Sequence, residues 1–295
     1  MAQPAAKLLT GFFVVAALLV VATLVLTRNQ PPPPSSSFPN PNGYDDFVKA
    51  GQMLADKTSD FSTMNEADLR SLVAKNSDAV KLTKTGLTRE CQVPLDFVNP
   101  NPSYFTNLGP MKRLAQAVAA QGRLADLDNH PAEAADAYLT VIRLGYAISR
   151  GGLLIDSLVG VAIEAIGTVN MEKLALRLDA QQCRDAVSAL ESCLALSEPS
   201  DLTVVRERTW NRRAYGLKGQ LAFLVNFRSI KQTEQRIVSR LNAQHARERV
   251  LLIQLASRAY ELENGEPPKT LAALVPDYLK SIPQNPLTRT NVAFP

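Results

Sequence analysis

The sequence is poor in the residues that build metal centres and disulfide frameworks. Its 295 residues include only two histidines, His130 and His245, and three cysteines. A structural zinc site takes four Cys or His ligands close together, so we expect no metal site and no cofactor. The odd number of cysteines leaves at least one thiol unpaired, and their wide spacing excludes a disulfide framework.

Signatures of catalysis and nucleotide binding are missing too. The sequence contains no G-x-S-x-G elbow, no G-x-x-x-x-G-K-[ST] phosphate loop and no G-x-G-x-x-G fingerprint. Basic and acidic residues nearly balance, 32 against 28, which does not favour a nucleic-acid partner. We therefore expect no catalytic residues and no bound nucleic acid. His245, which lies among arginines, is expected at the surface, and the single Trp210 in the core or at a helix interface.

An uncharged apolar run occupies residues 8–27, with the sequence LLTGFFVVAALLVVATLVLT. A helix of this length spans about 30 Å, the thickness of the hydrocarbon core of a bilayer. The run exceeds the roughly 7 to 15 apolar residues of a cleaved signal peptide. We expect residues 1–28 to be a retained, single-pass transmembrane anchor.

The residues that flank this run indicate its orientation. Lys7 and the amino terminus precede it, and Arg28 follows it, which favours a cytoplasmic N-terminus and an extracytoplasmic body. Residues 29–43 combine a four-proline run with Ser and Asn, which predicts an extended linker. The alternative for this segment is a proline-rich ligand for an aromatic groove.

The body, residues 44–263, has the pattern of an all-α protein. Stretches rich in Ala, Leu, Arg, Gln and Glu are separated by Gly and Pro, without the short alternating runs of a sheet. We expect an irregular multi-helix bundle that contains helical hairpins. Predicted helices include 45–56, 65–75, 114–128, 131–149, 153–178, 181–196 and 233–263. The turn at 128–131, Asp-Asn-His-Pro, closes one hairpin and begins a helix at its proline.

Two acidic residues stand out in the apolar helix expected at 153–178. Asp156 and Glu164 lie eight residues apart, so they fall on one face of a helix. A pair of carboxylates on one face would suit a hydrolase if both lined an open cleft. The alternative is that each carboxylate pairs with an arginine of a neighbouring helix.

Residues 206–249 form the one segment with a marked charge bias. It holds eleven basic and three acidic residues. This bias suits a surface for anionic partners, such as lipid headgroups or an acidic protein. The alternative is a solvated face with internal salt bridges. The candidate surface consists of Arg206, Arg208, Arg212, Arg213, Arg236, Arg240, Arg247 and Arg249.

The segment 259–286 begins with AYELENG and continues with Pro268, Leu271, Ile282-Pro283 and Pro286. It resembles the segment after the long helix of major pseudopilins from type II secretion systems. With the anchor and the helical middle, the chain also resembles a broad family of uncharacterised bacterial membrane-anchored helical proteins. The pseudopilin pattern requires Glu at the position that Ala16 occupies here. The resemblance therefore implies only an ordered, proline-pinned tail over 264–295.

These observations together predict an anchored binding or scaffold module of the cell envelope. The membrane contact would be made by residues 8–27, and the body would bind a protein or another envelope component. One alternative is an accessory protein of secretion or pilus assembly. Another is a hydrolase that uses Asp156 or Glu164.

Overall fold

The computed structural model describes residues 16–17, 20–21, 38–55, 61–286 and 290. The chain divides into two units, residues 1–37 and residues 38–295. The four described residues of the first unit are helical. The rest of the predicted anchor and the linker segment 29–37 lie outside the described residues.

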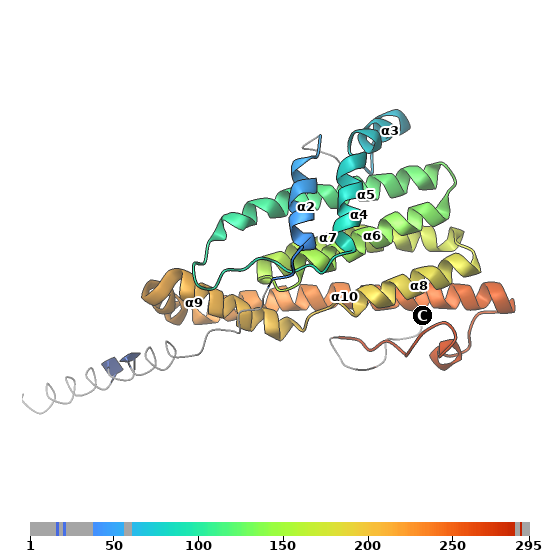
Figure 1. The fold of residues 1–295 in the computed structure, drawn as a ribbon. Helices are drawn as coiled ribbons and strands as arrows, with labels where there is room; N and C mark the ends of the chain where they lie inside the picture. The colour runs from blue at the N-terminus through green and yellow to red at the C-terminus, as the bar shows by residue number, and fades with distance from the viewer. Residues whose placement is uncertain (1–15, 18–19, 22–37, 56–60, 287–289, 291–295) are drawn as a thin grey trace, which may run out of the picture. The chain divides into compact units, whose positions relative to one another are not determined.

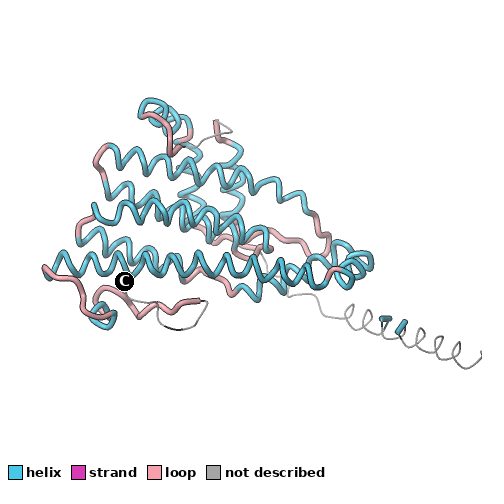
Figure 2. The backbone as a smooth tube through the Cα atoms, turned by 180° about the vertical axis from the view of Figure 1, so that it is seen from behind, coloured by secondary structure: helices cyan, strands magenta, loops and turns pink. Residues whose placement is uncertain are grey.

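The body is all-α, as its sequence pattern predicts. The described part of residues 38–295 contains nine α-helices and no β-strand, and the helices are joined by loops (Figures 1 and 2). The helices are α2 (Gly43–Gln52), α3 (Glu66–Lys75), α4 (Ser77–Leu87), α5 (Leu108–Leu127), α6 (Pro131–Ser149), α7 (Leu154–Leu174), α8 (Ala180–Leu194), α9 (Ser200–Val225) and α10 (Phe227–Asn264). Short 3-10 turns occur at η1 (Pro102–Asn107), η2 (Ala175–Arg177) and η3 (Leu271–Leu274).

Local signals fix several helix ends. The Asn65 side chain accepts a hydrogen bond from the backbone N–H of Asp68 and so caps α3. Pro131 starts α6, which matches its expected range of 131–149. Gly265 ends α10 with a left-handed φ of 79°, a conformation that glycine adopts without strain.

Helix α4 was not predicted, because its sequence SDAVKLTKTGL has few large apolar residues. Its buried face consists of small and β-branched side chains, and it packs against α2. There the backbone of Gly86 lies so close to α2 that a Cβ atom would meet Phe47 Cε1 at 2.7 Å. Tertiary contact therefore stabilises a helix that its own periodicity barely indicates.

Helices α6 and α7 pack with their backbones in close approach, which glycines allow. A Cβ atom on Gly167 of α7 would lie 2.6 Å from the carbonyl oxygen of Tyr138 on α6. A Cβ atom on Gly145 of α6 would lie 2.7 Å from the carbonyl oxygen of Gly160 on α7. Real side-chain contacts are not this short, so the spacing of these two helices depends on the missing Cβ atoms.

Helix α7 lies among α5, α6 and α10. Among the described residues, one segment, Leu154–Arg177, is long and apolar enough to cross a membrane by length and composition alone, with a mean hydropathy of 1.5. Core helices of globular proteins also meet these two criteria. Within this segment, 44% of the 18-residue apolar window is buried inside the body.

The C-terminal segment returns to the helices and joins the core. Leu274 and Leu279 are buried, and the Tyr278 ring lies 5.3 Å from that of Tyr260 on α10, centroid to centroid. The described residues of this segment pack on α10 and extend the core beyond residue 263.

Arg184 of α8 ties this segment to the bundle. Its guanidinium binds both carboxylate oxygens of Glu263 at 2.7 and 2.6 Å and donates to the backbone carbonyl of Asp277 at 2.8 Å. It also lies over the ring of Tyr278, 4.2 Å from the centroid. One side chain therefore connects α8, the end of α10 and the tail.

Replacing Arg184 by alanine should release the tail while the bundle stays folded. Losing charge-assisted hydrogen bonds worth about 1.5 kcal/mol would raise the open fraction of the tail roughly tenfold. Trypsin cleavage at Lys280, followed by mass spectrometry of the detergent-solubilised chain, measures this change. The control is Arg177→Ala, which removes an ion pair with Asp126 and no contact to the tail. Equal cleavage of the two variants would contradict the assignment.

Candidate functional site

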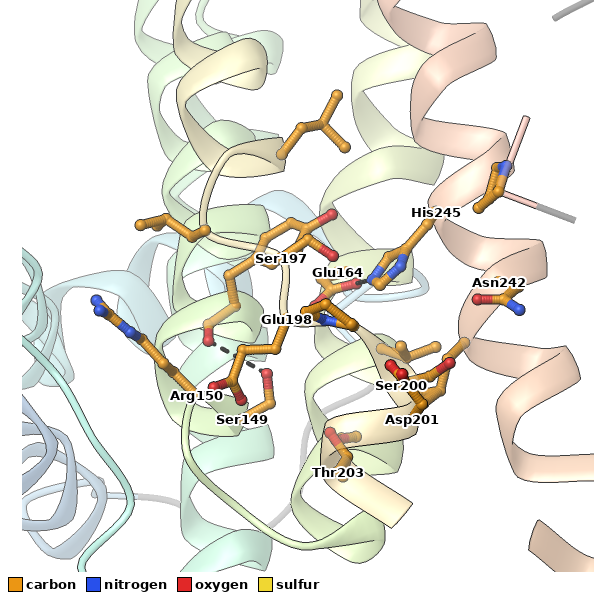
Figure 3. A pocket seen from close by; sticks show the side chains of 18 of the residues that line it. Ser149, Arg150, Glu164, Ser197, Glu198, Ser200, Asp201, Thr203, Asn242 and His245 are labelled. Carbon is orange, nitrogen blue, oxygen red and sulfur yellow. Dashed lines mark hydrogen bonds and ion pairs between the residues drawn. The ribbon is translucent and has the colours of Figure 1, made fainter. Parts of the chain in front are cut away.

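A cavity of about 560 Å³ opens between α6, α7, α10 and the connection from α8 to α9 (Figure 3). Such a volume is in the range of small-molecule sites. Its wall is rich in polar side chains, most of them hydroxyls, amides and carboxyls. The polar lining residues are Tyr146, Ser149, Arg150, Ser157, Glu164, Ser197, Glu198, Ser200, Asp201, Thr203, Asn242, His245 and Arg249.

Glu164 of α7 is the buried carboxyl group of this wall. Its side chain is 1% exposed, and its Oε2 atom has no hydrogen-bond partner among the described residues. Oε2 lies 3.6 Å from Nε2 of His245 on α10, longer than a good hydrogen bond. In Figure 3 the two side chains point toward one another across the wall of the cavity. A buried acceptor without a donor is rare and costs about 1 to 3 kcal/mol.

A second buried carboxyl group, Glu248 of α10, lies behind this wall. It accepts hydrogen bonds from the hydroxyl of Tyr146 on α6 and, at 3.0 Å, from the amide of Gln244. The same amide donates to the hydroxyl of Thr168 on α7 at 3.0 Å. His245 stacks on Tyr146 with a centroid distance of 5.6 Å. Three helices thus contribute to one polar cluster inside an apolar core.

The cluster is poor in charge despite its ionisable groups. Burial, and then repulsion from Glu248, raises the pKa of Glu164 well above its usual range. Burial also raises the pKa of Glu248. Burial and the nearby Arg249 lower the pKa of His245 to about 4. Burial therefore favours the protonated form of Glu164 and the neutral imidazole of His245.

The structure does not bring Asp156 and Glu164 into one cleft. Asp156 is fully buried at the start of α7, where it accepts hydrogen bonds from the backbone N–H of Leu153 at 2.7 Å and from Tyr104 at 2.9 Å. It does not line the cavity. Neither carboxylate forms the expected ion pair with an arginine in the described part of the chain. Asp156 acts as a helix cap, and this geometry does not favour the paired-carboxylate hydrolase.

Most arginines of the candidate anionic-partner surface have partners within the protein. Arg206 pairs with Glu198, Arg208 with Glu234 and Arg247 with Glu172. Arg213 and Arg249 donate to the backbone carbonyls of Phe97 and His245, and Arg212 also has a partner. Arg236 and Arg240 are exposed. These partners of Arg206, Arg208, Arg247, Arg213 and Arg249 weaken the positive electrostatic field that an anionic ligand would meet. Binding of an anionic partner at this surface stays a prediction.

Sequence reasoning missed five members of the cluster: Tyr146, Thr168, Gln244, His245 and Glu248. It placed His245 at the surface, but the side chain is only 15% exposed, because Tyr146 packs on its ring. It counted Glu248 only as one acid among basic residues, and it assigned no role to Tyr146. The i, i+4 spacing of Gln244 and Glu248 was the one local signal for this network. The prediction that Trp210 is buried is confirmed.

Comparison with known proteins adds no family assignment. No protein-family model, no curated protein and no solved structure matches this chain. The geometry of the cavity and the sequence pattern are therefore the basis for proposing a function.

Proposed function

We propose that this chain is a single-pass membrane-anchored module that binds a component of the cell envelope outside the cytoplasm. The apolar run at 8–27 and the positions of Lys7 and Arg28 support the anchor and its orientation. The Pro-rich residues 29–43 would separate the body from the lipid. The body would present the cavity to its ligand and need not catalyse a reaction.

The observation that carries this proposal is the unpartnered, buried Oε2 of Glu164 in the cavity wall. An unsatisfied polar group inside a protein destabilises the empty state. A ligand that donates a hydrogen bond to this atom removes the cost, so binding gains free energy that a satisfied wall would not offer. The cavity is large enough for a polar fragment of an envelope component.

Filling the cavity should abolish capture of that component. Ser197 lines the cavity, and Ser197→Trp would occupy part of its volume. The matched control is Ser192→Trp at an exposed position of α8 that does not line the cavity. Detergent-solubilised envelope is passed over each immobilised variant at low and moderate salt. We expect capture by the wild type and by the control, and its loss in Ser197→Trp. No capture by the wild type at either salt would contradict the proposal.

Membrane extraction tests the anchor separately. The intact chain should stay in the membrane pellet after an alkaline wash that removes peripheral proteins, because residues 8–27 would bury a full hydrocarbon span. A chain that begins after residue 37 should be released. Release of the intact chain by the same wash would rule out a transmembrane anchor.

A further inference from the structure

Glu164 and Glu248 are buried carboxyl groups of one polar cluster. Glu248 accepts a hydrogen bond from Tyr146, whose ring stacks on His245 beside Glu164. In the described part of the chain, no Lys or Arg forms a salt bridge with either one, and His245 is the only partner within ion-pair distance of Glu164. Buried carboxylates are ordinarily paired or fully hydrogen-bonded. Oε2 of Glu164 is thus a buried oxygen in the cavity wall without a hydrogen-bond partner among the described residues.

The spacing of two atoms indicates what would complete the site. Oε2 of Glu164 and Nε2 of His245 are 3.6 Å apart, too far for a good mutual hydrogen bond. One donor nitrogen can nevertheless lie about 2.9 Å from both atoms at once. The neutral imidazole has one ring nitrogen free to accept, and an ammonium group carries three N–H donors.

We propose that this cavity binds a small primary ammonium compound that also carries hydroxyl groups, with its nitrogen between Glu164 and His245. This assignment rests on the proposed binding function and names the chemistry of the ligand. The hydroxyls of Ser149, Ser197 and Ser200, which line the same cavity, provide partners for hydroxyl groups of the ligand.

The remaining charges of the lining are mixed. Arg249, whose charge lowers the pKa of His245, opposes a cation, whereas Arg150 lies 3.7 Å from Glu90. Glu198 is neutralised by Arg206, whereas Asp201 is exposed at the rim. An anionic ligand would instead face the carboxyl groups of Glu164 and Asp201.

Binding would release a proton. Burial and repulsion from Glu248 raise the pKa of Glu164 in the empty protein, and an ammonium ion beside it stabilises the carboxylate form. The proton leaves to solvent while the ligand nitrogen keeps its own three protons. Affinity should therefore rise as pH increases, until Glu164 is ionised in the empty protein as well.

Titration calorimetry on the full chain in detergent micelles tests the assignment. The probes are glucosamine, its isostere glucose, and N-acetylglucosamine, in which acylation removes the charge. At neutral pH we expect glucosamine to bind at least about tenfold more tightly than glucose, the scale of one charge-assisted hydrogen bond. N-acetylglucosamine should behave like glucose. Two buffers with different ionisation enthalpies should report net proton release on binding of glucosamine.

Two variants distinguish a specific role of Glu164 in binding from a general effect of negative charge in the cavity. Glu164→Gln should remove the preference for glucosamine, whereas Asp201→Asn, which changes an exposed carboxylate of the same cavity, should keep it. Far-UV circular dichroism confirms that each variant is folded. Equal binding of glucosamine and glucose, or a preference that survives in Glu164→Gln, would overturn the assignment. If Ser197→Trp still abolishes envelope capture in that case, the binding function stands and only the ammonium chemistry fails.

Discussion

The Gly167→Ala variant is expected to unfold with a free energy roughly 2 kcal/mol lower than that of the wild type. Alanine gains about 1 kcal/mol of helix propensity over glycine. Its Cβ atom, however, would lie 2.6 Å from the carbonyl oxygen of Tyr138 and 2.6 Å from Cγ1 of Ile142. The carbonyl oxygen of Tyr138 belongs to the backbone, so helix α6 would have to shift as a unit to relieve the contact. The cost of this clash exceeds the gain in helix propensity.

The control for this prediction is Ser188→Ala at an exposed position of α8. This substitution adds no atom to a contact between helices, so it changes mainly the helix propensity. The variant should be neutral or more stable by up to about 0.5 kcal/mol. Urea unfolding followed by circular dichroism measures both variants. An increase in stability for Gly167→Ala would show that the contact between α6 and α7 is looser than the structure indicates.

The second large effect is the pH dependence of stability due to Asp156. Burial raises the pKa of this carboxyl from 3.8 to about 6. Between these two values the unfolded chain releases the proton and the folded chain keeps it, so stability falls as pH rises. A shift of this size corresponds to about 3 kcal/mol once the pH exceeds 6. Below pH 3.8 the penalty is absent.

The Asp156→Asn variant removes this titration. Its stability relative to the wild type should therefore increase by about 3 kcal/mol between about pH 4 and pH 7. His245 and Glu164 titrate in both proteins, so their contributions cancel in the difference. The control is Ser188→Ala, at an exposed position of α8, which changes no ionisable group and should keep the pH dependence of the wild type. A constant difference for Asp156→Asn across this pH range would mean that Asp156 is ionised in the folded protein.

Much of the helical architecture was readable from local sequence. Asn65 caps α3, Pro131 starts α6 and Gly265 ends α10, because these residues satisfy or terminate helix backbone groups wherever the helix lies in the protein. The start of α5 was placed six residues too late, since Pro110 was taken as part of the preceding connection. It lies instead in the first turn of α5, where its missing N–H costs nothing.

The candidate site was only partly predictable. Glu164 stood out as an acid in an apolar helix, and its burial follows from that position. Its partners come from other helices, His245 and Glu248 about 80 residues later and Tyr146 on the preceding helix. Sequence periodicity shows which residues share a face of one helix, but it does not show which faces meet.

The sequence by itself determined that this protein has an all-α body, an apolar run long enough to span a bilayer, and few of the Cys and His residues that build metal sites. These properties depend on composition and on local backbone chemistry. Only the tertiary structure decided that Asp156 caps a helix while Glu164 lines a cavity, although both lie on one helix. The physical reason is that burial and hydrogen-bond partners are set by the neighbouring helices, which the close approach of α6 and α7 at Gly167 holds in place.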